Sequence, residues 1–327
     1  MMPSARGNAG PSQSVTVLLT SVGRQSYLVE AFQHAGSRVV ASDCDSFAAG
    51  IAAADHGLVS PAFGDPEYGN WLLQLCRAQS VDGIISLHTD ELVVLQTFHE
   101  ALHTSGVCLL GMTGENLMRC VDKRRLHEVA AGTDFAVPRS WDIARLDEIP
   151  ADAFPLLIKP AFGRGSRGNV FVSCHAEVTE QLRDAFVGPW LAQEFVDGVE
   201  YGLDLVNDLE GIPRAVLQRK KARMWNGETD VAETTSEPDL RAAAMLLAAK
   251  LRHSGLVDVD IMRSANGLFL LDINPRFGGG YIFNHAAGAN VPAALVAWLA
   301  GKQPDPSVFS FATGVAYARV STLQRIR

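Results

Sequence analysis

The stretch DVDIMRSANGLFLLDINPRFGGG covers residues 258–280 and contains two apolar segments separated by the turn signal Asn266-Gly267. Aliphatic residues flank oxygen-bearing side chains in both segments, which is typical of two neighbouring strands. Asp272 and Asn274 are two positions apart and therefore share one face of their strand. Acids among aliphatic residues are costly to desolvate unless they are paired or bound to a metal. The stretch therefore predicts an antiparallel hairpin whose acids have a function.

The length of the turn decides whether Asp260 joins this face. A two-residue turn at Asn266-Gly267 would set Asp260 opposite Ile273, on the wrong face. A three-residue loop over 265–267, with a left-handed glycine in a bulge, sets Asp260 opposite Asp272. We predict the three-residue loop.

This register gives a cluster of hard oxygen ligands, which are Asp260, Asp272 and Asn274. Two carboxylates and an amide oxygen suit Mg²⁺, or Mn²⁺ in its place, with phosphate oxygens completing the shell. Arg276 follows two residues later and is placed to brace a transferring phosphoryl group.

A second motif, Gly163-Arg-Gly-Ser-Arg-Gly168, matches GxGxxG. Residues 170–173 that follow it have a strand pattern rather than a helix pattern, which excludes a dinucleotide-binding turn. A protein kinase is excluded as well, because no HRD or DFG segment follows. The remaining interpretation is a flap over phosphates, in which Gly165 and Ser166 bring donors near the oxygens and Lys159 precedes the loop. A solvated surface hairpin is the alternative.

The chain as a whole changes pattern near residue 115. Before that point, apolar strands alternate with helices, which predicts βαβ units and an open parallel sheet. After it, strand–loop–strand patterns and one apolar helix over 240–253 predict antiparallel sheets. The fold class is therefore α/β followed by α+β. The predicted strands are 15–20, 38–41, 81–87, 107–110, 154–159, 170–173, 190–195, 201–206, 257–262, 268–273 and 313–320.

Composition narrows the class of protein further. The 327 residues include 28 Lys and Arg against 36 Asp and Glu, a net charge of −8 that argues against nucleic-acid binding. No apolar run is long enough to cross a membrane. Residues 1–14 are small and polar, and are expected to be a disordered leader rather than a secretory signal. Five scattered cysteines without a CxxC motif indicate neither zinc nor a disulfide framework, and we expect a cytoplasmic protein.

Several separated segments together resemble the ATP-grasp superfamily, and in particular the carbamoyl-phosphate-synthetase-like carboxylate–amine ligases of the PylC-like group. These segments are Asp122-Lys123, Ile158-Lys-Pro160 with its glycine flap, Gln193-Glu-Phe-Val-Asp-Gly-Val-Glu200 and Asp272-Ile-Asn-Pro-Arg-Phe-Gly-Gly-Gly280. The resemblance implies an N-terminal domain over 15–115 and a two-lobed ATP-grasp domain. The small lobe with the flap would cover 116–190, and the large lobe with the metal site would cover 191–327.

The resemblance also implies roles for individual residues. Lys123 and Lys159 would contact the phosphates of ATP. Gln193, Glu194 and Val196 would form the adenine hinge, and Glu200 would bind the ribose. Mg²⁺ would be held by the three oxygen ligands of the hairpin, and Arg276 would steady an acyl-phosphate.

The implied activity is a ligase that phosphorylates a carboxylate, expected to be that of an amino acid, and couples it to an amine with release of ADP and phosphate. A homodimer is compatible with this family. One alternative is a ligase acting on bicarbonate or another small acid, and another is a non-catalytic ATP-binding regulatory protein.

The substrate side is less defined by the sequence. The charged segment 219–230 is either a solvated loop or a stretch where Lys220 and Arg223 meet the phosphate or the substrate carboxylate. Gly279 and Gly280 allow a backbone to approach the reacting acyl group closely. Asn284 and His285 follow this loop and are candidates for orienting a substrate, although a single histidine is more often structural.

Overall fold

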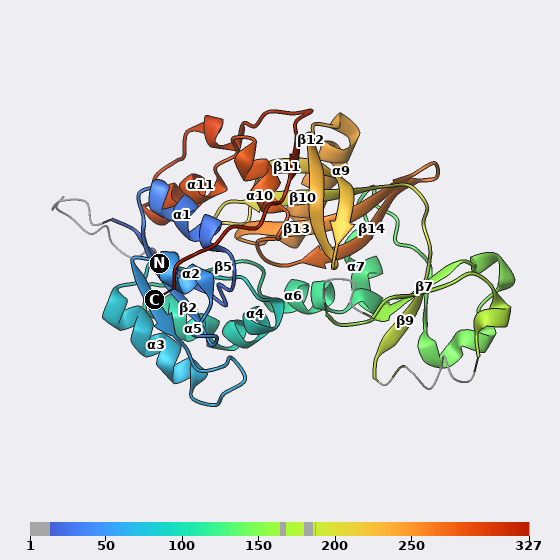
Figure 1. Cartoon of the computed structure of the whole chain (residues 1–327), viewed down its shortest axis with the longest axis horizontal. Helices are drawn as coiled ribbons and strands as arrows, with labels where there is room; N and C mark the ends of the chain where they lie inside the picture. The colour runs from blue at the N-terminus through green and yellow to red at the C-terminus, as the bar shows by residue number, and fades with distance from the viewer. Residues whose placement is uncertain (1–13, 164–167, 180–185, 187, 327) are drawn as a thin grey trace.

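The computed structural model describes residues 14–163, 168–179, 186 and 188–326, and it contains three β-sheets (Figure 1). The N-terminal sheet is parallel and the two others are antiparallel, as their registers show. The predicted fold class is therefore confirmed. The domain boundaries given above stay a prediction, and the leader lies outside the described residues.

The N-terminal sheet has the strand order β3-β2-β1-β4-β5, with helices along both faces. Its strands are β1 (Thr16–Thr20), β2 (Arg38–Asp43), β3 (His56–Val59), β4 (Gly83–Ser86) and β5 (Cys108–Leu110). Its helices are α1 (Ser26–His34), α2 (Ala49–Ala53), α3 (Tyr68–Gln79), α4 (Thr89–Leu95), η1 (Gln96–Phe98) and α5 (His99–Thr104). The first strand is buried at every position, which explains its unbroken aliphatic sequence.

A broken helical segment leads from this sheet to the next. It consists of α6 (Gly114–Val121), η2 (Lys123–Arg125) and α7 (Leu126–Ala130). The break falls at Asp122, whose extended backbone and side chain cap the short helix η2 by accepting a hydrogen bond from the Arg124 amide. The break places Lys123 so that its amide bonds the carbonyl of Ala161, at the start of the glycine flap.

The four-stranded sheet of the small lobe has the order β6-β9-β7-β8. Its strands are β6 (Ser140–Asp142), β7 (Leu156–Pro160), β8 (Val170–Val172) and β9 (Trp190–Glu194), with η3 (Ile143–Glu148), η4 (Ala151–Ala153) and η5 (His175–Glu177). One face carries Leu156, Ile158 and Ala192 into a small core against η3 and η4. The opposite face, which carries Lys159 and Gln193, is left for the site.

The six-stranded sheet of the large lobe has the order β14-β13-β10-β11-β12-β15. Its strands are β10 (Val199–Asn207), β11 (Pro213–Trp225), β12 (Glu228–Thr235), β13 (Gly255–Ser264), β14 (Gly267–Asn274) and β15 (Ala316–Ala318). The helices of this lobe are α9 (Pro238–Leu251), α10 (Tyr281–Ala286), α11 (Val291–Leu299) and η6 (Pro306–Phe309). The charged segment 219–230 is thus part of a long hairpin, so its interpretation as a solvated loop is wrong.

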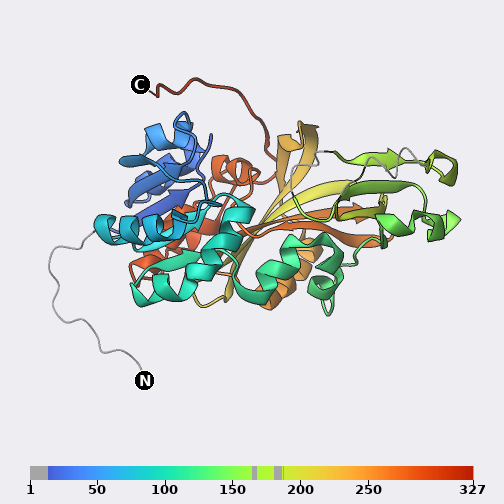
Figure 2. The same cartoon turned by 90° about the horizontal axis from the view of Figure 1, so that it is seen from below.

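The two faces of this sheet have different neighbours. Leu203, Leu205 and Val259 pack against α9. Val206, Leu217 and Leu256 face the other way, toward α11 and the N-terminal sheet. Figure 2 shows the large sheet between the N-terminal unit and the small lobe. No helix within the described residues has the length and apolar character needed to cross a membrane.

Candidate active site

The acids of β13 and β14 lie together on the face of the large sheet that points away from α9. Asp260 is the Cα partner of Asp272, and Asp258 is the partner of Asn274. The Asn274 side-chain amide donates to Asp258 at 3.2 Å. The pairing predicted between Asp260 and Asp272 is therefore present.

The extra residue that produces this pairing is not where it was expected. Ser264 pairs with Gly267, so the loop has two residues, Ala265 and Asn266, and the three-residue loop is wrong. The register shifts instead between Asp260 and Ile261, where Leu271 has no Cα partner and forms a β-bulge. The Nζ of Lys159, from the small lobe, lies 3.4 Å from the carbonyl oxygen of this bulged residue.

Buried lysines converge on the two acids from three directions. The Nζ of Lys221 lies 2.6 Å from Asp260 and 2.7 Å from Glu200. The Nζ of Lys123 lies 3.2 Å from Asp272 and donates to the carbonyl of Gly163 at 2.7 Å. Together with Lys159, these side chains connect the large sheet, the broken helix and the glycine flap.

The surroundings displace the pKa values of two of these lysines in opposite directions. Burial lowers the pKa of Lys159 to about 8, although the nearby Asp272 carboxylate opposes this effect. Burial also acts on Lys221, but its direct contacts with Asp260 and Glu200 raise its pKa above the ordinary value. Lys221 is therefore a fixed positive charge, whereas Lys159 titrates in a range near neutrality.

The donor set fits a divalent cation. Asp260 and Asp272 each hold a lysine ammonium group, which is a cationic stand-in beside the oxygens that Mg²⁺ prefers. The amide oxygen of Asn274, on the same face, is 3.3 Å from the guanidinium of Arg276. Among the described residues no group of three His, Cys, Asp or Glu side chains suits a metal, so a cation here would need Asn274 and substrate oxygens.

A buried ion-pair network lies next to these acids and holds Asp258. Arg219 is 1% exposed and contacts Asp204 at 2.7 Å as well as Asp258. Asn284 also donates to Asp204, at 2.6 Å. Burial lowers the pKa of Arg219, but Asp204 and Asp258 outweigh it and raise the pKa above its usual range. The network fixes Asp258, which in turn holds Asn274.

Two glycines make room for this guanidinium. A Cβ built on Gly280 would lie 2.2 Å from Nε of Arg219, and one built on Gly202 would lie 2.7 Å from it. Neither position tolerates a side chain unless Arg219 moves. Gly280 packs against the network, and its approach to an acyl group stays a prediction.

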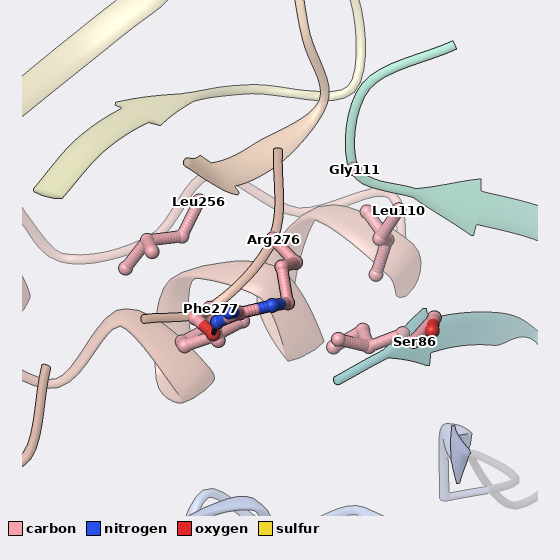
Figure 3. Close-up of a pocket in the computed structure, with 7 residues that line it drawn as sticks. Ser86, Leu110, Gly111, Leu256, Arg276 and Phe277 are labelled. Atoms are coloured by element: carbon pink, nitrogen blue, oxygen red, sulfur yellow. Dashed lines mark hydrogen bonds between the residues drawn. The ribbon is translucent and has the colours of Figure 1, made fainter. Parts of the chain in front are cut away.

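Arg276 faces the N-terminal unit. Figure 3 shows its side chain between Phe277 and the end of β4 at Ser86. Its guanidinium donates to the Phe277 carbonyl at 2.6 Å and lies near Asn274. The crevice that it lines with Ser86, Leu110 and Gly111 leaves no room for a water molecule. Arg276 therefore lies where the carboxyl edge of the parallel sheet meets the face of the large sheet that carries Asp272 and Asn274.

The predicted hinge residues are the last two residues of β9, Gln193 and Glu194, and Val196 just after it. Gln193 is buried on the same face as Lys159, and its Nε2 has no hydrogen-bond partner among the described residues. Glu194 pairs with Arg139 at 3.1 Å, and Val196 is half-buried. Gly165 and Ser166, predicted to contact phosphates, lie outside the described residues.

A cavity of about 340 Å³ opens beside Lys123, between η2 and the inner face of the small lobe. Its lining is basic on one side and mixed on the other, and comprises Lys123, Arg124, His127, Val137, Ser140, Trp141, Asp142 and Leu191. It adjoins Leu191 of β9, the Cα partner of Lys159 in β7, which is the strand that precedes the glycine motif.

The structure does not bring all predicted substrate residues to this face. Lys220 lies on the opposite face of β11 from Arg219 and Lys221, because side chains alternate along a strand. Arg223 is largely exposed and pairs with Asp230 of the same hairpin. His285 lies 3.0 Å from the Ala289 carbonyl and 3.3 Å from the Tyr281 hydroxyl, and burial lowers its pKa. Asn284 belongs to the Arg219 network.

Sequence reasoning missed three residues of the face, which are Asp204, Arg219 and Lys221. It also missed the supporting role of Asp258. The available signal was the spacing of Arg219 and Lys221, which are two positions apart and would share one face of a strand. The lack of an apolar period in Arg219-Lys-Lys-Ala-Arg223 concealed it.

Three sheets with this order, and lysines from two lobes around paired acids, define the ATP-grasp class of fold. Two family models match the chain. One is described as PylC-like, N-terminal domain, and covers residues 17–110; the other is described as ATP-grasp in the biosynthetic pathway with Ter operon, and covers residues 186–323. The chain belongs to the ATP-grasp superfamily and has a PylC-like N-terminal domain.

Curated relatives match part of their own length. The arginine-specific large chain of carbamoyl phosphate synthase from Bacillus subtilis (strain 168) is 25% identical over 194 residues, which are 54% of this chain and 18% of that protein. The carbamoyl phosphate synthase large chain from Xylella fastidiosa is 25% identical over 221 residues, 61% of this chain and 20% of that protein. The chain thus spans about a fifth of the length of these curated relatives.

Solved structures share the fold at low identity. The L-amino acid ligase from Bacillus licheniformis has a TM-score of 0.70 at 17% identity, with 92% of this chain and 78% of that chain covered. Biotin carboxylase from Campylobacter jejuni gives 0.69 at 15%, with 92% and 74% covered. The N5-carboxyaminoimidazole synthetase from Staphylococcus aureus, complexed with ADP, gives 0.70 at 16%, with 91% and 81% covered.

Proposed function

We propose that this chain is an ATP-dependent, ADP-forming ligase that activates a carboxylate as an acyl-phosphate and joins it to an amine. The observation that carries the proposal is the convergence of three buried lysines on the paired acids. Lys221 lies 2.6 Å from Asp260, Lys123 lies 3.2 Å from Asp272, and Lys159 lies 3.4 Å from the Leu271 carbonyl. Such a collection of ammonium groups, facing oxygen ligands, is suited to a polyphosphate.

The proposed site gives the acids and the lysines different roles. Asp260, Asp272 and Asn274 would hold Mg²⁺, which when bound would neutralise phosphate charge. Lys123 and Lys159 would exchange their present partners for phosphate oxygens.

The base and ribose of ATP would bind at the hinge and at Glu200. The buried Nε2 of Gln193 supports this assignment, because it has no partner among the described residues and a buried donor is costly until a ligand satisfies it. Glu194, Val196, Gly165 and Ser166 complete the proposed nucleotide site.

The proposed chemistry has two steps. A carboxylate oxygen attacks the γ-phosphorus of ATP, the bond to the bridging β–γ oxygen breaks, and ADP leaves. The amine nitrogen then attacks the acyl carbon, phosphate leaves, and the extra proton of the nitrogen departs with it. Arg276 would hold the transferring phosphoryl group, since its guanidinium lies beside Asn274 at the end of the acid face.

An amino acid is the acid that we favour. The fold similarity to an L-amino acid ligase supports it, and the carbamoyl phosphate synthase matches keep bicarbonate as the competing acid. A cytoplasmic location is proposed with it, because ATP and free amino acids are cytoplasmic metabolites. A homodimer is proposed too, since the fold-related Hydrogenobacter thermophilus carboxylase domain was solved as a dimer.

Hydroxylamine provides a test that does not require the amine to be known. It traps an acyl-phosphate as a hydroxamate, so the protein is mixed with MgATP, hydroxylamine and each of the common amino acids or bicarbonate. We expect ADP release and a hydroxamate with at least one amino acid. ADP release with bicarbonate alone would favour the competing acid, and ATP binding without ADP release from any acid would favour a regulatory protein.

Arg276→Ala tests the catalytic assignment. We expect turnover to fall by about 100-fold or more, because one charge-stabilising group of the transition state is lost. The affinity for ATP should change much less. Arg214→Gln is the control, since Arg214 pairs with Asp208 at the far end of β11. Full activity of Arg276→Ala would refute its role.

A further inference from the structure

A second group of arginines lies on the far side of the Gly278–Gly280 loop from the acid face. Arg319 follows β15, and its amide bonds the carbonyl of Asp230 at 2.9 Å, which fixes the C-terminal segment along β12. Its guanidinium donates to the carbonyl of Gly279. Figure 1 shows this last segment of the chain, in dark red, running from β12 toward the N-terminal unit.

One carboxylate already occupies this place. Glu228 of β12 lies 3.3 Å from Arg319 and 3.7 Å from Arg24, which comes from the loop after β1. The side chains of Glu228 and Arg24 are 54% and 89% exposed, so both are free to rearrange, whereas that of Arg319 is 27% exposed. The Nε of Arg319 has no hydrogen-bond partner among the described residues.

A chain of contacts connects Arg319 with the proposed site of acyl transfer. Gly279 accepts from Arg319 on one side of the loop, and the next residue, Gly280, packs against Arg219 on the other. Arg219 contacts Asp258, which holds Asn274. The ring of Phe283 lies 5.6 Å from the Arg319 guanidinium and gives it an apolar wall.

Resting on the proposed function, we infer that Arg319, assisted by Arg24, binds the carboxylate of the amine substrate, so that this substrate is itself an amino acid. Guanidinium groups pair with carboxylates through two parallel hydrogen bonds, and this geometry selects for a planar anion. The Glu228 carboxylate is a stand-in from the chain itself and shows that such a group fits between the two arginines. A simple alkylamine has no carboxylate with which these two arginines could pair.

Binding measurements test the inference without turnover. The full chain is loaded with Mg²⁺, a non-hydrolysable ATP analogue and an excess of one common amino acid at a time, which fills the site of the acid substrate, and is then titrated calorimetrically with the other amino acids and their methyl esters. We expect at least one amino acid to bind, and its ester, which lacks the carboxylate charge, to bind at least tenfold more weakly. Arg319→Gln should bind the acid as weakly as the ester, while Arg214→Gln should bind like the wild type.

Hydroxamate formation separates this inference from the proposed function. Hydroxylamine has no carboxylate, so Arg319→Gln should lower hydroxamate formation much less than it weakens amino acid binding, while losing discrimination between amino acid and ester. If the wild type forms hydroxamate but binds no second amino acid, or binds ester and acid equally, the inference is wrong and the ligase proposal stands. If discrimination is present and no hydroxamate forms, the ligase proposal is the one that fails. Discrimination that survives in Arg319→Gln would also overturn the inference.

Discussion

At the residue scale, two equally buried lysines illustrate how the site distributes charge. Lys221 touches Asp260 and Glu200, so its pKa is raised although burial alone would lower it. Lys159, by contrast, contacts a backbone carbonyl and no carboxylate among the described residues. Burial lowers its pKa to about 8, with Asp272, Asp260 and Glu200 opposing and Lys123 adding to the shift. A direct carboxylate contact decides whether the buried ammonium keeps its proton.

This difference predicts a pH dependence of nucleotide binding. The pKa of Lys159 is depressed, so the side chain is charged below about pH 8 and neutral above it. The affinity of the free protein for ATP should be constant near pH 7 and fall as the pH rises through 8, by at most about tenfold per pH unit for one proton. Dissociation constants measured between pH 6.5 and 9.5 in one buffer mixture, at about constant ionic strength, would show it.

Lys159→Met supplies the control for this profile. The variant lacks the titrating group, so it should bind ATP more weakly at pH 7 and show a flat profile above it. A wild-type profile without a decline, or a decline equally steep in Lys159→Met, would assign the titration to another group.

The sequence contained part of this residue-scale picture. The shared face of Asp272 and Asn274 follows from alternation alone, and it is present. Lys221 could not be separated from Lys220 in the same way, because a run of charged residues has no apolar neighbours to mark the inward face. Arg219 is buried because Asp204 and Asp258, 15 and 39 residues away in the chain, supply its partners.

At the element scale, the side chain of Arg219 on β11 can lie over β10 only because Gly202 lacks a side chain. A Cβ at this position would lie 2.7 Å from Nε of Arg219, and β10 is central in the sheet, with β13 on its other side. The strand pair thus carries the network that supports Asp258, and through it Asn274.

Gly202→Ala should therefore destabilise the protein and weaken catalysis together. Overpacking a buried site typically costs about 1–3 kcal/mol in the free energy of unfolding, and displacement of Arg219 should also disturb Asp258. Urea unfolding and ADP release measure the two effects. Gly64→Ala is the control, because Gly64 has ordinary backbone geometry and nothing within 4 Å of an added Cβ. Unchanged stability in Gly202→Ala would show that Arg219 has room to move.

The hairpin of β13 and β14 shows the limit of predicting elements from turn signals. Counting residues from Asn266-Gly267 required one extra residue for Asp260 to meet Asp272, and the expected place was the loop. The strand accommodates it at Leu271 instead, where the bulged carbonyl is near Lys159 of the other lobe. Tertiary contact with a distant element decided the position, and turn chemistry alone does not contain that contact.

At the scale of the whole molecule, the succession along the chain of a parallel sheet and then antiparallel sheets was predictable. The short strands and the breaks in helices were not. Long aliphatic runs separated by helices marked the parallel sheet, and the change of pattern near residue 115 marked the antiparallel ones. β3 and β6 have weak apolar patterns, and the cap at Asp122 separates α6 from η2. Such breaks depend on local capping and on contacts between lobes.

The same arrangement predicts how a ligand stabilises the whole chain. Lys159 belongs to the small lobe, Lys123 to the broken helix and Asp272 to the large sheet, so a bound metal–nucleotide complex would contact all three parts. Binding to the folded state alone should add about 2.7 kcal/mol to the free energy of unfolding at a ligand concentration of 100 times Kd. The melting temperature should therefore rise by several degrees with MgATP, and less with ATP in EDTA.

Asp272→Asn distinguishes the metal from the nucleotide in this shift. The variant loses a carboxylate ligand but frees Lys123 for phosphate, so it should keep the stabilisation by ATP in EDTA and lose the additional part that requires Mg²⁺. Glu148→Gln, an exposed acid of η3 paired only with Arg145 among the described residues, should retain both parts. An equal Mg²⁺-dependent shift in Asp272→Asn and in the wild type would show that Asp272 is not a metal ligand, because losing a ligand weakens the binding of the ion.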